Sequence, residues 1–305
     1  MIITIGKPCA ITEKGGRSNN EDSIYPLPEQ VTLDQKLFMV CDGVGGAEKG
    51  EVASSLACES IQTFFSTFLK DDPTPEFIHK AVHYAEVCFD SYVQEHPEAM
   101  GMATTLTMAY IASSGIVLAH IGDSRIYHLR KGEILYQTED HSLVNSLVKL
   151  GKITPEEALT HPQRNVIIRA IQGTHTPTEA DIITLNDIQP DDFLFLCTDG
   201  VLEKIAEIFN GRLSVPEIKD ALMEACDGKT RDNFSFYIYT KRIDNELEYP
   251  RVPLGEEINN SDRILRGNGA KPLPDLLPYR LFETKIQDSE HLLEIPFDSS
   301  LCRSR

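Results

Sequence analysis

Short apolar runs rich in β-branched and aromatic residues recur through the first 240 residues of the chain. The clearest lie at Lys36–Cys41, Thr105–Ile111, Ile116–Ile121, Arg125–Leu129, Glu133–Gln137, Asp181–Leu185, Phe193–Cys197 and Phe234–Thr240. Their length and composition predict β-strands. Only a few residues, such as 113–115 and 130–132, separate the central runs. Such short links favour antiparallel hairpins, because parallel neighbours need a long crossover.

Two longer segments repeat apolar residues at helical spacing. The first, residues 48–69, carries Val52, Leu56, Phe64 and Phe68 in this pattern, which predicts a helix. The second begins at Thr74-Pro75, a capping residue followed by proline at the first helical position. Capping-box patterns at residues 154–157 and 214–217 predict two further helix starts. Runs of strands with segregated helices predict an α+β fold, not a doubly wound parallel sheet.

The pattern changes at Ile243. Prolines and a Gly-Asn-Gly turn at residues 267–269 interrupt short mixed segments with no sustained period. We therefore predict a domain over residues 1–242 and a C-terminal extension over 243–305. Two interpretations of the extension remain open: a flexible, partly ordered tail, or a segment whose apolar patches dock on the domain or on a protein partner.

Composition narrows the class of protein. The 305 residues include 29 Lys+Arg and 47 Asp+Glu, for a net charge of −18, which argues against binding to nucleic acid or to an anionic membrane. The first residues lack the pattern of a signal peptide, and no apolar run approaches the roughly 20 residues that span a bilayer. Seven scattered cysteines form no Cys-x-x-Cys pair. We therefore expect reduced thiols and a cytoplasmic location.

Three apolar runs end beside an aspartate and a glycine: at Asp42-Gly43, Gly122-Asp123 and Asp199-Gly200. Each alone is an ordinary turn signal. Strand ends that gather three carboxylates, however, bring together like charges that a bound cation must neutralise. Glu21-Asp22 and Asp232-Asn233 have similar settings. Oxygen ligands without neighbouring His or Cys favour Mg²⁺ or Mn²⁺ over zinc or copper.

Arg17 lies four residues before Glu21 in a polar loop. An isolated arginine in a loop is usually a solvated surface residue. Beside several metal-binding carboxylates it becomes a candidate phosphate ligand, because a guanidinium group can bind two phosphate oxygens at once.

These segments resemble, in order, the metal-dependent protein phosphatase family of type 2C, which removes phosphate from serine and threonine. The matching pieces are Arg17-Ser18-Asn19-Asn20-Glu21-Asp22, Asp42-Gly43-Val44-Gly45-Gly46, Ala103-Thr104-Thr105, Gly122-Asp123-Ser124-Arg125, Asp140-His141-Ser142, Asp199-Gly200 and Asp232-Asn233. They span about residues 7 to 240. The resemblance implies an α+β fold, a four-layer αββα sandwich of two antiparallel sheets flanked by helices.

The resemblance also implies a set of roles. Asp42 would bridge two Mn²⁺ or Mg²⁺ ions, with Asp199 and Asp232 on one ion and Glu21 and the Gly43 carbonyl on the other. Asp123 and Asp199 would form a weaker third site. Arg17 would bind the substrate phosphate, and Asp22 would orient water. A hydroxide bridging the two core ions would attack phosphorus in line, without a phosphoenzyme.

The sequence departs from the family pattern at two positions. Val44 stands where eukaryotic members often carry histidine, which resembles the bacterial subgroup and leaves the identity of the general acid open. Ala103 stands where the family often has glycine. Residues 140–173 resemble the family's flap, which borders the cleft. We expect His141 and His161, both in this segment, to have surface or packing roles, not acid–base roles.

The sequence therefore predicts a Ser/Thr protein phosphatase that acts on phosphorylated proteins and opposes a bacterial Ser/Thr kinase. Two alternatives remain. One is a non-catalytic module with the same fold that binds phosphoproteins, which the complete set of metal carboxylates disfavours. The other is a metal-dependent hydrolase of small phosphate esters.

Overall fold

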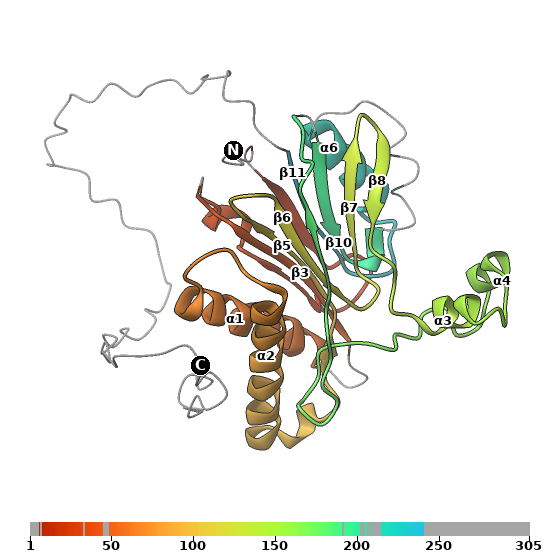
Figure 1. Cartoon of the computed structure of the whole chain (residues 1–305). Helices are drawn as coiled ribbons and strands as arrows, with labels where there is room; N and C mark the ends of the chain where they lie inside the picture. The colour runs from red at the N-terminus through yellow and green to blue at the C-terminus, as the bar shows by residue number, and fades with distance from the viewer. Residues whose placement is uncertain are drawn as a thin grey trace, which may run out of the picture. The chain divides into compact units, whose positions relative to one another are not determined.

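Two antiparallel β-sheets packed face to face form the core of the computed structural model (Figure 1). It describes residues 6, 8–32, 34–44, 49–190, 192–201, 205, 208 and 215–240. The five-stranded sheet has the order β1 (Cys9–Glu13), β11 (Phe234–Thr240), β10 (Asp192–Cys197), β7 (Arg125–Arg130) and β8 (Glu133–Gln137). The six-stranded sheet consists of β2 (Asp22–Tyr25), β3 (Leu37–Val44), β5 (Leu106–Ile111), β6 (Ile116–Ile121) and β9 (Asp181–Leu185), with β4 (Ala103–Thr104) paired to β3.

Helices cover the outer faces of both sheets. Helices α1 (Gly50–Phe68) and α2 (Pro75–Glu95) pack on the six-stranded sheet, and α6 (Val215–Cys226) packs on the five-stranded sheet. The connection from β8 to β9 carries α3 (Leu143–Lys149) and α4 (Pro155–Leu159). Three 3₁₀ turns complete the described elements: η1 (Pro28–Gln30), η2 (Pro97–Ala99) and η3 (Asp199–Val201). The predicted αββα sandwich is confirmed.

Alternating side chains of β3 serve two apolar layers. Phe38 and Val40 face the other sheet, where the Phe38 ring lies 5.4 Å from Tyr237 and 5.1 Å from Tyr239 between ring centroids. Met39 and Cys41 face the opposite way, toward α1 and α2. A buried apolar side chain of this size contributes about 1.5–3 kcal/mol. The strand is therefore fixed from both sides, as expected for a strand with a continuous apolar run.

Helix α1 packs on the six-stranded sheet through a side that includes part of the predicted pattern. Phe64 is buried as the apolar spacing indicates, and Val52, Leu56 and Phe68 are partly buried against the same layer. The most deeply buried residues include Ala53, Ala57 and Ile61, and the small alanines let the helix approach β3 closely. The apolar spacing therefore located the helix correctly but missed the small residues at the centre of its contact.

The predicted caps agree with the structure where they are described. Thr74 Oγ1 accepts the Phe77 N–H at 3.2 Å at the start of α2, and Thr154 and Glu157 form the predicted capping box of α4. The cap predicted at Ser214, before α6, lies outside the described residues.

Residues 241–305 also lie outside the described part of the chain. The domain boundary and the role of the tail therefore remain predictions. None of the described helices is long and apolar enough to cross a membrane.

Candidate metal centre

The apolar layer between the two sheets ends in carboxylates. Along β3, Asp42 follows Phe38 and Val40 on the face that looks toward the other sheet. Asp22 on β2 pairs directly with Asp42 in the antiparallel register. Directly paired residues point to the same side of a sheet with their Cβ atoms about 5 Å apart. The two carboxylates are therefore neighbours at the end of the inter-sheet layer.

The five-stranded sheet brings its own carboxylates to the same end. Asp199 follows β10 and opens η3, and Asp232 precedes β11, which pairs antiparallel with β10. Thr198 crosses the layer between the sheets, because its hydroxyl donates to Asp22 Oδ2 at 3.0 Å and accepts the Ser235 N–H at 3.0 Å. Sequence reasoning gave Thr198 no role, since the residue it contacts lies 176 positions away.

Glu21 and Gly43 lie together against the first turn of α1. The Gly43 N–H donates to the Glu21 carbonyl at 3.0 Å. Gly50 begins α1, and a Cβ atom on it would lie 2.7 Å from the Gly43 carbonyl oxygen and 2.8 Å from Glu21 Oε2. Only glycine fits this close approach. The carbonyl and the carboxylate predicted as ligands of one ion are thus adjacent.

Asp123 lies in the tight loop between β6 and β7. Gly122 has a φ of +102°, and a Cβ atom there would lie 2.5 Å from Thr105 Cγ2, so the loop requires glycine. Thr105 Oγ1 accepts the Asp42 N–H at 2.9 Å and lies 2.7 Å from Ser124 Oγ. One threonine therefore connects the backbone at Asp42 with the loop of Asp123.

Burial and mutual repulsion raise the pKa values of these carboxyl groups. Burial raises the pKa of Asp42 well above its ordinary value, and the charges of Asp22, Asp199, Asp123 and Asp232 add to the effect. Burial is also the main cause that raises the pKa of Asp22 and of Asp123 to about 7 and that of Asp199 to about 6. Such a cluster disfavours its own ionisation unless a cation neutralises it.

Buried carboxylate oxygens without hydrogen-bond partners indicate whether divalent cations would fit the cluster. Asp22 Oδ1 and Asp123 Oδ1 are buried and have no hydrogen-bond partner among the described residues. The same holds for Glu51 Oε2 in α1, and after burial the Glu51 charge is the next cause that raises the pKa of Glu21. Buried polar atoms are normally paired, and Mg²⁺ and Mn²⁺ prefer carboxylate oxygen. The donor set therefore fits hard divalent cations, with Glu51 as a nearby carboxylate that the sequence did not indicate.

Arg17 lies at the rim of the cluster. Its Nη2 atom donates to Asp232 Oδ2 at 2.6 Å, and the two side chains are 56% and 40% exposed. Asn233 holds the loop that carries Arg17, because its Nδ2 donates to the carbonyls of Lys14 and Asn19 and its Oδ1 accepts the Glu21 N–H. The structure thus brings every residue predicted for the site to one end of the sandwich: Arg17, Glu21, Asp22, Asp42, Gly43, Asp123, Asp199 and Asp232.

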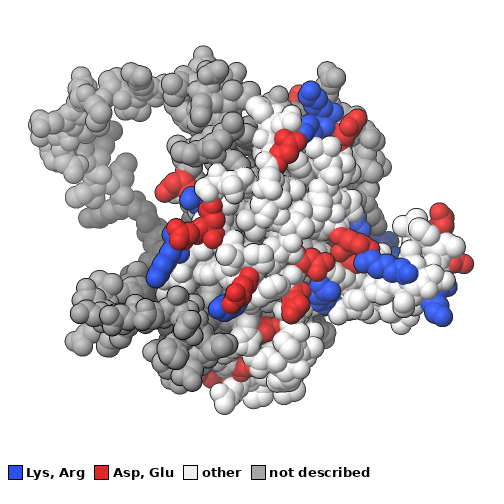
Figure 2. Space-filling model, viewed as in Figure 1, with Lys and Arg blue, Asp and Glu red and all other residues white. Residues whose placement is uncertain are grey.

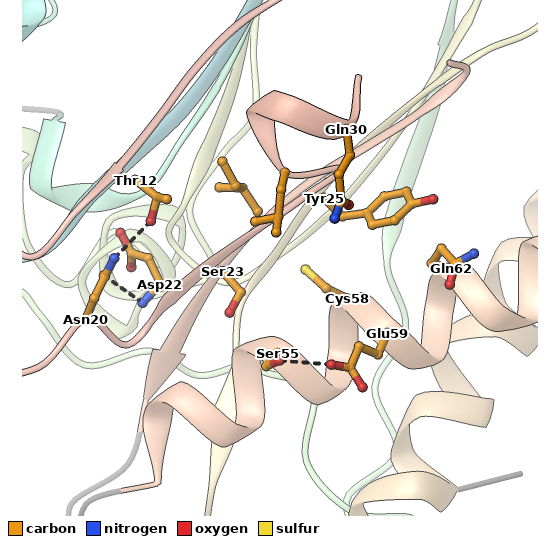
Figure 3. Close-up of a pocket in the computed structure, with 12 residues that line it drawn as sticks. Thr12, Asn20, Asp22, Ser23, Tyr25, Gln30, Ser55, Cys58, Glu59 and Gln62 are labelled. Carbon is orange, nitrogen blue, oxygen red and sulfur yellow. Dashed lines mark hydrogen bonds between the residues drawn. The ribbon is translucent and has the colours of Figure 1, made fainter. Parts of the chain in front are cut away.

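A cavity of about 400 Å³ lies beside this cluster, between the free edge of β2 and α1 (Figure 3). Asp22 and Asn20 line one end, and Tyr25, Gln30 and Gln62 line the other. Among the described residues, its lining contains no lysine or arginine, so this part of the cavity does not suit a phosphate group. The described face in Figure 2 likewise carries Asp and Glu interspersed with Lys and Arg, with no continuous basic surface.

Comparison with known proteins identifies close likenesses. The sequence profile of the family described as "Protein phosphatase 2C" matches residues 15–233. The serine/threonine protein phosphatase PstP of Mycobacterium tuberculosis is 36% identical over 210 residues, which cover 67% of this chain and 38% of PstP. The crystal structure of M. tuberculosis PstP/Ppp covers 79% of this chain and 100% of that chain, with a TM-score of 0.67 and 32% identity. A crystal structure of the PstP catalytic domain in complex with two manganese ions also matches. The match covers 78% of the present chain and 98% of the PstP domain, with a TM-score of 0.63 and 30% identity.

Proposed function

Because the chain belongs to the protein phosphatase 2C family, we propose that it is a Mn²⁺- or Mg²⁺-dependent phosphatase of bacterial phosphoserine and phosphothreonine proteins. One observation carries the proposal: carboxylates from both sheets converge at one end of the sandwich, with Asp22 Oδ1 and Asp123 Oδ1 buried and unpartnered among the described residues. The manganese ions named for the related PstP catalytic domain support the same cation chemistry.

In the arrangement that the family resemblance implies, the cluster would divide into ligands for two core ions and a weaker third ion. Asp42 would be shared by the core ions, and its charge interacts with those of Asp22, Asp199, Asp123 and Asp232. Asp199 and Asp232 would complete one core site, and Glu21 with the Gly43 carbonyl would complete the other. Asp123 and Asp199 would hold the third ion. Bound there, the ions supply Lewis acidity that lowers the pKa of water and neutralises phosphoryl charge.

Two side chains act on the substrate and the attacking water. Arg17 binds the phosphate group, and it is available to do so because an exposed ion pair such as Arg17–Asp232 contributes only about 0–1 kcal/mol. Asp22 has one oxygen held by Thr198 and the other without a partner among the described residues. Its free Oδ1 accepts a hydrogen bond from water and orients it toward phosphorus.

We further infer that the partners are phosphorylated proteins and the Ser/Thr kinase that modifies them, in the cytoplasm. Five of the six described cysteines are buried, and no disulfide joins any two of them, which is typical of proteins in a reducing compartment. A protein partner of the tail remains a hypothesis, because residues 243–305 lie outside the described part of the chain.

A chelator-controlled assay tests the proposed function. With Mn²⁺ present, we expect release of phosphate from a phosphothreonine peptide and loss of that activity in excess chelator. A phosphotyrosine peptide and small phosphate monoesters serve as comparison substrates, and we expect slower turnover of both. Peptide binding without hydrolysis in Mn²⁺ would support the binding module, and faster hydrolysis of the small esters would support the metabolite hydrolase. Either result would overturn the proposal.

Substitution of Arg17 should separate phosphate binding from cation binding. We expect Arg17→Lys to raise KM for the phosphothreonine peptide about tenfold, since lysine keeps the charge but loses two-point binding of phosphate oxygens. Arg17→Ala should raise it further. The melting temperature should change little, because the pair with Asp232 is exposed.

Lys80→Ala is the matched control for these Arg17 variants, because it removes one positive charge from α2, where Lys80 pairs with Glu76. We expect KM to stay at the wild-type value. An Arg17→Ala variant with unchanged KM would contradict the assigned role.

A further inference from the structure

Two histidines and an aspartate form a second cluster next to the loop of Asp123. Ligand atoms of His120, His141 and Asp181 lie within 4.8 Å of one another, and the two imidazole rings are 4.7 Å apart between centroids. Two histidines and a carboxylate can hold a transition metal. Whether they do depends on the hydrogen bonds that each ring nitrogen already makes.

Both nitrogens of His141 are engaged. The Gly122 N–H donates to Nδ1 at 3.0 Å, so Nδ1 carries a lone pair and no hydrogen. Nε2 then carries the hydrogen and donates to Asp181 Oδ2 at 3.0 Å. His120 Nε2 donates to the Ser124 carbonyl at 2.8 Å, since a carbonyl oxygen only accepts. His141 has no lone pair left for a metal ion, so the cluster is a hydrogen-bonded support.

This support holds the Asp123 loop from both sides. His141 binds Gly122 twice, because its own backbone N–H also donates to the Gly122 carbonyl at 2.8 Å. On the other side, His120 holds the Ser124 carbonyl, and Thr105 lies against the Ser124 hydroxyl. Among the described residues, Asp123 Oδ1 is left without a partner. The loop is therefore fixed while its carboxylate stays open toward the cation site.

The outer end of the cluster fixes the state of the His141 ring. Asp181 accepts a hydrogen bond from Arg169 Nη1 at 2.7 Å in addition to that from His141. Burial would raise the pKa of Asp181, but these two hydrogen bonds hold it below its ordinary value. An anionic Asp181 keeps the hydrogen on Nε2 and the lone pair on Nδ1. The His141 backbone carbonyl also accepts the Ile168 N–H at 2.9 Å, which joins the two ends of the flap.

We propose that His141 is a positioning residue, whose Nδ1 holds the Gly122 N–H so that Asp123 points into the weak third cation site. Asp181 and Arg169 keep the ring in the form that can do so. The inference rests on the proposed function only in taking Asp123 as a cation ligand. It assigns a role to a residue for which the sequence indicated surface or packing contact.

Two substitutions separate the functions of the two ring nitrogens. His141→Asn keeps an acceptor near the Nδ1 position through Oδ1 and loses the contact with Asp181. His141→Gln places an amide near the Nε2 position and loses the acceptor for Gly122. Both variants lose the packing contacts of the imidazole ring. A difference in cation binding between the two variants therefore reports on the hydrogen bond from Gly122. Each is made in the full chain.

Cation binding is the main readout. Mg²⁺ is titrated into the substrate-free protein and followed through the backbone amide signals of residues 122–124 by NMR. We expect the weak-site dissociation constant of His141→Asn to stay within about threefold of wild type and that of His141→Gln to rise about tenfold, the size typical of support residues around a metal. In the metal-free wild type, a scalar coupling between the Gly122 nitrogen and His141 Nδ1 should be detectable.

His128→Gln is the matched control. His128 is a buried histidine whose Nε2 pairs with Asp192 at 2.8 Å, at the end of β10 opposite to Asp199. We expect a lower melting temperature and unchanged Mg²⁺ binding. Equal Mg²⁺ affinity in wild type and His141→Gln, equal loss in both His141 variants, or absence of the coupling would overturn the proposal. If the protein hydrolyses no phosphopeptide, the proposed function fails, yet these measurements still decide the role of His141.

Discussion

Replacing Asp42 by Asn is expected to abolish hydrolysis of a phosphothreonine peptide in Mn²⁺. The amide keeps the shape of the side chain but removes the charge that the two core ions of the proposed arrangement would share. Loss of several kcal/mol of charge stabilisation lowers kcat by about a thousandfold or more. The fold should persist, because the Asp42 backbone is held by Thr105 and Thr104. Steady-state kinetics and calorimetric titration with Mn²⁺ measure the two effects.

Asp187→Asn is the matched control for this substitution. Asp187 is 74% exposed and pairs with Arg130, which also pairs with Asp192 at the start of β10, the end of that strand opposite to Asp199. The same chemical change there should leave kcat and Mn²⁺ binding at wild-type values. Near-normal turnover by the Asp42→Asn protein would remove Asp42 from the site and with it the proposed arrangement of the ions.

Without divalent ions, the protein should lose stability as the pH rises from 6 to 8. The folded-state pKa is about 6 for Asp199 and about 7 for Asp22 and Asp123, above the ordinary value near 3.8 that the unfolded chain has. The folded protein therefore binds more protons than the unfolded chain between these pH values. The stability that protonation of these carboxyl groups provides is complete below their pKa in the unfolded chain, and it is lost as the pH rises through their pKa in the folded protein. The total loss is on the order of a few kcal/mol. Mn²⁺ should restore most of it at pH 8.

Thermal melts in Mn²⁺ and in chelator, from pH 6 to pH 8, measure this effect. Burial lowers the pKa of His120 to about 3. Near pH 6 this favours the unfolded chain, in which the histidine is protonated, and so has the opposite effect on stability to that of the carboxyl groups. The effect is the same in Mn²⁺ and in chelator. The difference between the two series therefore isolates the cation site, and it should grow with pH. Asp22→Asn should raise the melting temperature of the metal-free protein at pH 8. A difference that does not depend on pH would contradict the expected repulsion.

The sequence predicted most of the sheet framework because long, apolar strands carry a local signal. The predicted bounds of β6, β8, β9 and β11 coincide with those of the structure. The short strands β1 and β2 were not predicted. Both lie at the edges of their sheets, and Asp22–Tyr25 has only four residues with two polar side chains. Their strand conformation depends on pairing with β11 and β3, which no local pattern reveals.

The same limit applies to the site. The carboxylates were found because each stands in a short motif at the end of a run, and the resemblance to a family ordered them. Two of the residues that support them, Thr198 and Asp181, were given no such role. Thr198 contacts Asp22 across the layer between the sheets, and Asp181 contacts His141 from 40 positions away. These contacts arise only when the two sheets and the flap are assembled, so neither composition nor spacing indicates them.

The position of the carboxylates at the end of the apolar layer has a mechanical consequence. Glu21 and Asp42 adjoin strands of one sheet, Asp199 and Asp232 adjoin strands of the other, and Asp123 lies in the loop that joins β6 of the first sheet to β7 of the second. The gap that the proposed cations would bridge is therefore set by the thickness of the layer in which Phe38 meets Tyr237 and Tyr239. Because packed interiors transmit small changes in volume, cation affinity is expected to depend on the spacing between the sheets. Core substitutions far from any ligand can thus change how tightly the ions are held.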